Sequence, residues 1–398
     1  MCGGETGSGA SAGVKTTMKT EAFDHYLAQC VRSFVRSDLA PEWPNDLEID
    51  TRAAATRITF HGVALLLVEA AQGLPGWPSA LAELVNDEAR SQSFWELSHQ
   101  RIMARLTDSL HQAGIEAYIL KGTALAYSVY PKPALRRRGD SDLLISGTDR
   151  EKARAVFRAC GFTRWSDVRP LQECWQSPPE LGFNHSIDLH WRVSASPAVS
   201  QLLEANQADR QVVALPQLGP NAVGLSAIEN LLLICINRAA HGRFGYLVGD
   251  TMLFENDRLI WALDIHLITA TFSESDWGKL ATRAAESGSS DIVLSGLQLA
   301  RSSMGTIIPD TVLKTLETQS ADKRLSHYLA RASGRERFLL DLAASPNLSE
   351  KTRLVVLKLF PGKELLHERY PDATHWPTLA LRLRRLFSGV GNFVKGRA

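Results

Sequence analysis

Two aspartates with one residue between them form the most chemically distinctive pattern in the chain. Asp140 and Asp142 lie in the segment LRRRGDSDLLIS, directly after three arginines. Residues i and i+2 of a strand point to the same side, so both carboxylates would share one face. Carboxylates that close repel each other unless a cation lies near them. That cation is either the arginine run or a metal ion, and the residues alone leave both interpretations open.

A third acid, Asp188, lies in the segment GFNHSIDLHWRV, whose alternation is typical of a strand and places Asp188 and His190 on one face. Mg²⁺ and Mn²⁺ prefer oxygen ligands, and Mg²⁺ binds through one or two carboxylates together with water and substrate phosphates. We therefore predict that Asp140, Asp142 and Asp188 hold a divalent metal and carry the catalysis. His190 would order Asp188 or contact a phosphate, unless it is a core histidine beside Trp191.

The segment LKGTALAY has the composition of a phosphate-binding turn. Gly122 lets the backbone approach a phosphate, and Thr123 offers a hydroxyl at the start of the next helix, where N–H groups point outward. Lys121 and Arg136 are the cations that we expect to bind a triphosphate. The alternative for Lys121 is an ordinary solvated residue at the end of a strand.

Two further groups of charged residues fit structural roles. Arg137 and Arg138 are expected to be ordinary surface charge. His241 and Asp264 lie in a helical pattern, where a buried pair that links helices is a better interpretation than a catalytic base.

The elements around these motifs predict an α+β fold. Helical patterns precede and follow a short region with strand-like patterns, and a longer helix is expected before the first strand, with Gly114 as its left-handed C-terminal cap. We expect a disordered N-terminal arm at 1–19, an N-terminal helical region at 20–86, a small mixed-sheet αβ core at 87–215 and a C-terminal helical domain at 216–398.

Composition excludes several classes of protein. The formal net charge of +1 gives no global signal for a nucleic-acid partner, and no apolar run reaches the length of a membrane span. The five cysteines include no CxxC pair, which favours a reducing compartment and argues against a disulfide framework or a zinc site. Without a secretory signal at the N-terminus, a cytoplasmic location is expected. The basic C-terminal LRLRRLF favours packing over nucleic-acid or membrane contact.

The order strand, Gly-Thr, helix, Asp-x-Asp strand, helix, third-Asp strand is similar to that of the nucleotidyltransferase superfamily, the DNA polymerase β-like fold. Within it, ILKGTALAYSVYPKPALRRRGDSDLLI and IDLHW resemble blocks of the uncharacterised, stand-alone bacterial nucleotidyltransferase family. The resemblance covers roughly residues 95 to 390. Thr123 replaces the usual second Gly or Ser of the signature and keeps a hydroxyl, whereas Asn237 stands where a histidine is expected in the helical block.

This resemblance implies a transferase whose αβ core is a nucleotidyltransferase core. It would be a Mg²⁺-dependent enzyme that binds ATP or another NTP and moves its NMP to an acceptor with release of pyrophosphate. The acceptor is not identified by the residues, and a peptide, a natural product or another small molecule is a candidate. The alternatives are kinase-type phosphoryl transfer on the same fold and a non-catalytic nucleotide-binding or antitoxin-like partner protein.

Overall fold

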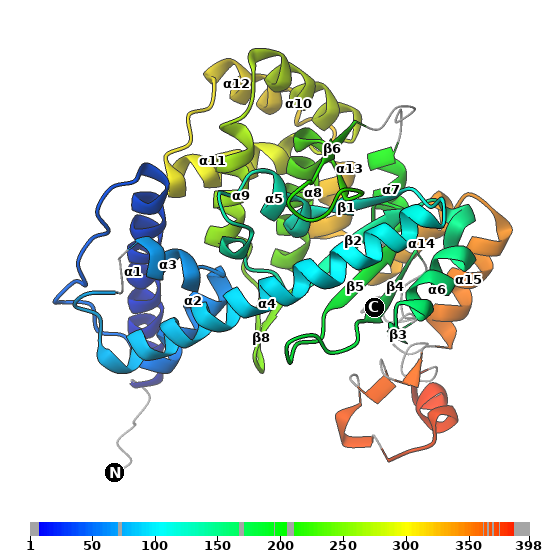
Figure 1. Ribbon diagram of the computed structural model, residues 1–398, viewed down its shortest axis with the longest axis horizontal. Helices are drawn as coiled ribbons and strands as arrows, with labels where there is room; N and C mark the ends of the chain where they lie inside the picture. Colours follow the sequence, from blue (N-terminus) through cyan, green and yellow to red (C-terminus); the bar gives the residue numbers. More distant parts are fainter. Residues whose placement is uncertain are drawn as a thin grey trace, which may run out of the picture.

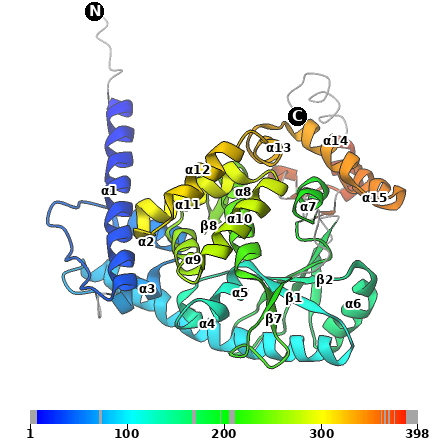
Figure 2. The same ribbon diagram turned by 90° about the horizontal axis from the view of Figure 1, so that it is seen from above.

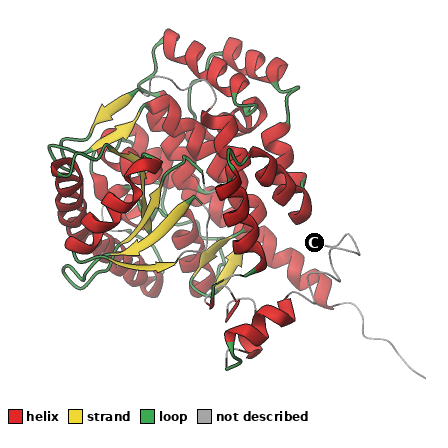
Figure 3. Cartoon of the chain, turned by 90° about the vertical axis from the view of Figure 1, so that its right-hand side faces the viewer, coloured by secondary structure: helices red, strands yellow, loops and turns green. Residues whose placement is uncertain are grey.

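A computed structural model describes residues 8–385, apart from 71–73, 167–170, 195, 205–210, 361, 364–365, 368–369 and 374. A mixed sheet lies at its centre and helices cover the sheet on both sides (Figures 1 and 3). The strands are β1 (Ala117–Leu120), β2 (Asp140–Ile145), β3 (Thr163–Ser166), β4 (Gln172–Gln176), β5 (Ser186–His190), β6 (Val212–Ala214), β7 (Val223–Leu225), β8 (Tyr246–Val248) and β9 (Thr251–Leu253). These elements confirm the predicted α+β class with a mixed sheet.

Fifteen labelled α-helices follow one another along the described part of the chain. They are α1 (Ser8–Arg36), α2 (Thr51–His61), α3 (Ala64–Ala70), α4 (Ser79–Gln112), α5 (Lys121–Ser128), α6 (Arg150–Ala159), α7 (Pro197–Glu204), α8 (Ala227–Phe244), α9 (Leu259–Thr269), α10 (Glu274–Glu286), α11 (Ser290–Met304), α12 (Asp310–Gln319), α13 (Arg324–Ser326), α14 (Gly334–Ala344) and α15 (Leu348–Leu359). Short 3₁₀ turns are η1 (Pro133–Leu135), η2 (Gly147–Asp149) and η4 (Pro371–Ala373), and η3 (His327–Arg331) is a π-helical turn.

The order of the strands in the main sheet is β3-β4-β5-β2-β1-β7-β6. β2 runs parallel to β5 and antiparallel to β1, so the strands that carry the acid motifs are neighbours in the middle of the sheet. The register pairs Asp142 with Asp188 across β2 and β5 and pairs Asp142 with Leu120 across β2 and β1. The two acid motifs and the end of β1 therefore meet at one place on the sheet.

Alternation along β2 gives the sheet two different faces. Leu143 and Ile145 point into a core cluster that they share with Ile187 and Leu189 of β5 and with the second half of α4. Asp140 and Asp142 point to the opposite face because their positions are offset by one residue. Figure 2 shows α4 along one side of the sheet and α8 on the other.

The helix α4 places its apolar residues on one stripe, which explains why it covers the sheet over such a length. Its buried positions recur every three or four residues, as in an amphipathic helix. Gly114 adopts φ +65° just after it, and Ile115 donates its N–H to the carbonyl of Leu110 at 3.0 Å. This is a Schellman termination, as predicted for Gly114. The helix itself begins at Ser79.

Helices from both ends of the chain share a hydrophobic core. Phe23 of α1, Leu66 of α3, Leu232 of α8 and Leu297 of α11 belong to one buried cluster that also reaches Leu144 of β2. The expected N-terminal and C-terminal helical regions are thus packed into one core on the acid-bearing side of the sheet.

Some boundaries differ from the expected domain organisation. α1 begins at Ser8, inside the segment that we expected to be a disordered arm, and residues 1–7 lie outside the described part. The sheet also extends to Leu225 of β7, beyond residue 215, where the predicted core ended. Four strands of the sheet, β3, β4, β6 and β7, were not predicted.

Within the described residues, no single helix is long and apolar enough to cross a membrane. By length and composition alone, α2 and α3 meet that criterion as a pair, with a bend of 99° between them.

Candidate functional site

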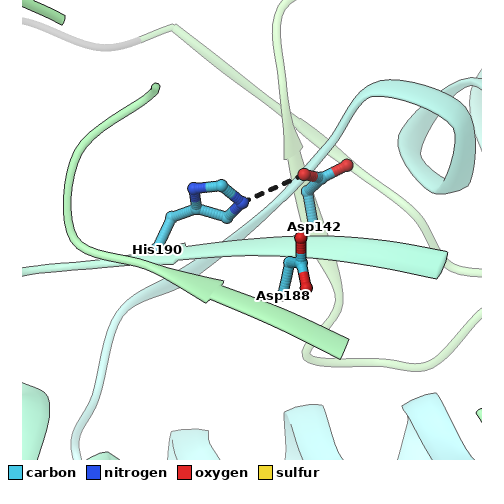
Figure 4. Close-up of side chains that lie close together, drawn as sticks. All are labelled: Asp142, Asp188 and His190. Atoms are coloured by element: carbon cyan, nitrogen blue, oxygen red, sulfur yellow. Dashed lines mark hydrogen bonds and ion pairs between the residues drawn. The ribbon is translucent and has the colours of Figure 1, made fainter. Parts of the chain in front are cut away.

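The predicted acids of β2 and β5 lie together on one face of the sheet. Asp142 and Asp188 are register partners, and His190 follows Asp188 on the same face of β5 (Figure 4). The His190 Nε2 atom lies 3.0 Å from Asp142 Oδ1, and each of the three side chains offers a ligand atom within 4.8 Å of the others. We call Asp142, Asp188 and His190 the acid cluster. It could hold a metal ion.

Asp140 lies at the start of β2, on the same face as Asp142 but exposed to solvent. Its side chain is not among the three whose ligand atoms meet within 4.8 Å. The sequence placed Asp140 on the same footing as Asp142, whereas the structure places it at the rim of the acid cluster.

The cation nearest the acids is Lys121. Its Nζ lies 2.7 Å from Asp142 Oδ1, and Asp142 is thereby contacted by both Lys121 and His190. Lys121 is the first residue of α5 and adopts φ +52°, a left-handed conformation that is rare for a residue with a side chain. A specific hydrogen bond stabilises this turn: the Lys121 N–H donates to Asn230 Oδ1 at 2.9 Å.

Asn230 is a site residue that sequence reasoning missed. It is buried on α8, 109 positions after Lys121, and its amide N–H group donates to the carbonyl of Leu225 at 2.9 Å. Both ends of its side-chain amide are thus bonded to backbone. No local pattern in the sequence connects a helical asparagine with a turn so far away, so nothing short of the fold could have indicated its role.

The arginine run does not neutralise the aspartates. Arg136 forms a bidentate pair with Asp264 of α9, with both N···O distances at 2.7 Å. Arg137 pairs with Glu88 of α4, and Arg138 pairs with Glu96 of the same helix. The first of the two proposed cations, the arginine run, is thus engaged elsewhere. This leaves Lys121 beside the aspartates.

Arg136 supports the Gly-Thr turn from behind. A Cβ atom at Gly122 would lie 3.4 Å from the Arg136 guanidinium, so glycine leaves room for this close approach. Arg136 is buried, and its third nitrogen donates to the carbonyl of Arg137. The structure therefore gives the guanidinium protein partners where the sequence suggested a phosphate.

Arg138 corrects a sequence-based expectation. We expected ordinary surface charge, but its side chain is only 3% exposed and its Nη2 lies 3.0 Å from His99 Nδ1. The reason is that α4 supplies an acid, Glu96, directly beside it. Glu96 and His99 were not singled out by the sequence because they lie in an ordinary amphipathic helix.

The underside of β2 is fixed by a chain of hydrogen bonds. Ser141, between the two aspartates, points to the opposite face, where its hydroxyl lies 2.8 Å from Thr123 Oγ1 and 2.7 Å from His99 Nε2. Thr123 is buried, so its hydroxyl holds α5 against β2 and does not lie at the surface. Only the backbone of the Gly-Thr turn remains available for the phosphate-binding role that we predicted for it.

The surroundings of the two β2 acids shift their pKa values in opposite directions. Burial opposes ionisation of Asp142, but the charge of Lys121 and the hydrogen bond from His190 outweigh it and hold its pKa well below the usual range. Desolvation and the charges of Asp142 and Asp188 raise the pKa of Asp140. Because Asp140 is exposed, solvent screens these contributions.

Asp188 is oriented by a strand that the sequence analysis did not predict. Gln172 of β4 is buried, and its amide nitrogen donates to Asp188 Oδ2 at 2.8 Å. β4 pairs antiparallel with β5, which brings Gln172 beside His190 and Cys174 beside Asp188. One oxygen of Asp188 is thereby held while the other remains for a ligand.

The acid cluster fits a hard divalent cation. Carboxylate oxygens are the usual protein ligands of such ions, whereas an imidazole nitrogen suits transition metals better. His190 is buried, and its Nε2 atom faces Asp142, whereas its Nδ1 atom lies on the other side of the ring and has no hydrogen-bond partner among the described residues (Figure 4). Two neighbouring acids and a histidine, with Lys121 beside them, can gather a metal and an anionic substrate at one place.

His241 and Asp264 each contact other residues of the structure. Asp264 is fully buried and accepts hydrogen bonds from Arg136 and from the Tyr130 hydroxyl, so it joins α9 to the αβ core. The His241 Nδ1 atom lies 2.9 Å from the Gly245 carbonyl, and its ring stacks on Trp261. Both residues have structural contacts of the kind that the sequence favoured, but with other partners.

Comparisons with known proteins give one match. A family model described as uncharacterised nucleotidyltransferase matches residues 48–305, more than half of the chain and all strands of the main sheet. A search of curated proteins and a search of solved structures each returned no match.

Proposed function

The chain belongs to the uncharacterised nucleotidyltransferase family, and on that premise we propose that it moves an NMP from an NTP to an acceptor and releases pyrophosphate. The observation that carries this proposal is the acid cluster beside Lys121 and the start of α5. Acids that could hold a divalent metal lie next to groups that could bind a triphosphate. This combination is what nucleotidyl transfer needs.

The triphosphate would lie over the start of α5. The residue before this helix, Leu120, provides no side-chain cap, and Asn230 bonds only the N–H of Lys121, so the next N–H groups of the first turn remain for a ligand. Such N–H groups, with the positive end of the helix dipole, favour an anion. Gly122 has no side chain to block the backbone there. The Lys121 ammonium, which pairs with Asp142, could pair with a phosphate oxygen instead.

The metal, Mg²⁺ or Mn²⁺, would be held by Asp142 and Asp188, with Asp140 or His190 as a further ligand. When bound, it would neutralise the negative charge that develops on the phosphates. With substrate bound, Lys121 would contact the phosphates in place of Asp142. Gln172 would keep Asp188 oriented throughout, because its hydrogen bond uses only one carboxylate oxygen.

The acceptor would attack the α-phosphorus in line with the leaving group. Its hydroxyl or amine would transfer a proton to Asp188 Oδ1, the oxygen that Gln172 does not hold and that keeps a second lone pair beside the metal, while the new P–O or P–N bond forms. The bond to the pyrophosphate oxygen breaks, and pyrophosphate leaves with the bonding electron pair. The protein's contribution is positioning and charge neutralisation, which suffice for phosphoryl-type transfer.

The test is pyrophosphate release with each of the four NTPs, Mg²⁺ or Mn²⁺, and a cell lysate as a mixed acceptor pool. Asp142→Asn keeps the shape of the side chain and should reduce metal-dependent release at least about a hundredfold, the scale seen when one transition-state charge contact is removed. The matched control is Asp149→Asn, which alters an acid of η2 outside the acid cluster.

Each outcome separates the proposal from its rivals. Metal-dependent release that Asp142→Asn loses and Asp149→Asn keeps supports nucleotidyl transfer and names the base. A product that gains one phosphate, without pyrophosphate, supports the kinase-type alternative. NTP binding without any product supports a non-catalytic binding protein.

A further inference from the structure

A cavity of about 240 Å³ lies between α4 and the segment that leads into β2. Three parts of the chain line it: the middle of α4, the segment from Arg136 to Gly139, and Tyr246 of β8. Gly139 directly precedes Asp140, and Arg136 lies against Gly122, where we place the triphosphate. Two residues of its lining thus connect the cavity to the proposed site: Gly139, next to Asp140 in the chain, and Arg136, next to Gly122.

The charges around this cavity are balanced. Arg136 is paired with Asp264, Arg137 with Glu88, and Arg138 with Glu96; these three pairs use every arginine of the lining. A phosphate would bring uncompensated negative charge into such surroundings. The cavity suits an uncharged group, and its volume is below the usual range of about 300–1,000 Å³ for sites of drug-sized ligands.

Two polar atoms in the lining lack partners in the described part of the chain. Gln92 is buried and its amide nitrogen donates to the carbonyl of Ala134, whereas its Oε1 atom accepts no hydrogen bond. Arg138 is also buried, and its Nε–H has no acceptor although its Nη atoms are bonded. A buried polar group without a partner costs free energy, so an unpaired acceptor and an unpaired donor call for an explanation.

A nucleobase would satisfy these features together. Its edge presents hydrogen-bond donors and acceptors side by side, and its ring is flat and uncharged. Trp95 and Tyr246 line the same cavity with aromatic surface, the kind of surface on which bases pack. A base is also joined through its ribose to the phosphates, which matches a cavity that begins beside Gly122 and Asp140.

We propose that this cavity binds the base of the NTP, with Gln92 Oε1 accepting a hydrogen bond from a base N–H and Arg138 Nε donating one to a base acceptor. This inference rests on the proposed function, because it assumes that the bound ligand is an NTP. It assigns the base to the α4 side of the sheet, and the acceptor must approach from another direction.

The experiment compares two ligands that share the phosphate end and differ in the base. Calorimetry would measure the binding of each NTP and of inorganic tripolyphosphate, with Ca²⁺ to prevent turnover. Gln92→Leu removes the unpaired acceptor at nearly constant volume. Gln100→Leu is the matched control, because Gln100 lies on the same helix and donates to Gln217 outside the cavity. Trp95→Leu is a second variant, at a partly exposed residue.

We expect at least one NTP to bind more tightly than tripolyphosphate. Gln92→Leu should weaken binding of that NTP by about three- to tenfold, the effect of one neutral hydrogen bond, and leave tripolyphosphate unchanged. Trp95→Leu should show the same selectivity, and Gln100→Leu should have no effect.

Equal weakening of NTP and tripolyphosphate by Gln92→Leu would overturn the inference, since the variant would then act through the phosphate end. So would NTPs that bind no better than tripolyphosphate, because the base would contribute nothing. If neither ligand binds the wild type, the proposed function fails as well. The two failures are therefore distinguishable.

Discussion

The arginine segment and the acid cluster are neighbours in the chain with opposite electrostatic designs. Each of Arg136, Arg137 and Arg138 has its own carboxylate, supplied by α9 or α4. Around Asp142 the acids outnumber the cations, since Asp140 and Asp188 share the charge of Lys121 with it. Paired charges hold elements together, whereas a surplus of one sign leaves room for a ligand of the other sign. The difference separates structural from functional charge within a few residues.

The largest expected effect on stability comes from the arginine segment, whose charges are paired. Asp264→Ala would leave the buried Arg136 without its partner, and removing one member of a buried ion pair costs about 3–5 kcal/mol. Denaturant unfolding should show this loss of stability. A loss below about 1 kcal/mol would mean that Arg136 finds another partner. The paired charges of the arginine segment would then not hold the elements together as described.

The acid cluster should respond to metal instead. Mg²⁺ or Mn²⁺ at one hundred times its dissociation constant should stabilise the wild type by about 2.7 kcal/mol, since binding to the folded state alone shifts the unfolding equilibrium. Thermal unfolding with and without metal would measure this. Asp142→Asn should abolish the shift and Asp149→Asn should keep it. A shift that survives Asp142→Asn would place the metal elsewhere.

Acid pH should reduce the stabilisation that the Arg138–Glu96 pair gives the folded state. Burial raises the pKa of Glu96, but the charge of Arg138 and the hydrogen bond with His99 outweigh this and hold the pKa below its usual range. Its stabilisation is therefore fully present above the unfolded-state pKa of about 4.3 and is lost as pH falls below that value.

The corresponding variant is Glu96→Gln. At pH 7 it should be less stable than the wild type by about 1.5–3 kcal/mol, the range for hydrogen bonds to charged groups. The difference between the two proteins should narrow at pH values below 4. If the difference in unfolding free energy stays constant with pH, Glu96 does not titrate with folding as described.

The smallest effect belongs to the most exposed pair. Arg137 and Glu88 keep about a third and a fifth of their side-chain surface exposed. Solvent screens such a pair, so Arg137→Ala should change the unfolding free energy by less than about 1 kcal/mol. A loss as large as that of Asp264→Ala would show that burial does not determine how much each of the three arginine pairs contributes to stability.

The sequence predicted the acid-bearing strands because their signals are local. Alternation over a few residues placed Asp142 and Asp188 on strands, and the resemblance placed those strands side by side. The strands β6 and β7 were missed because each has only three residues. In β7, Gly224 also has a low strand propensity, and it allows close packing against Ala124 of α5. Asn230 and Gln172 reach their partners only through the fold.

The same limit explains the arginines. Sequence proximity to Asp140 suggested that they would neutralise it, but burial depends on what α4 and α9 bring to the opposite side. Asp264 lies 128 positions after Arg136, and only the packed structure shows that this distant acid claims it.

The bond between the Lys121 amide and Asn230 also bears on how such a protein can change over evolution. The turn that holds the lysine in its left-handed conformation is secured from α8, outside the segment that contains the acid motifs. The αβ core therefore depends on α8 and could not be combined with an unrelated helical region without losing this hydrogen bond. A lineage that replaced its helical region to accept a new acceptor would have to keep, or reinvent, one buried amide facing this turn.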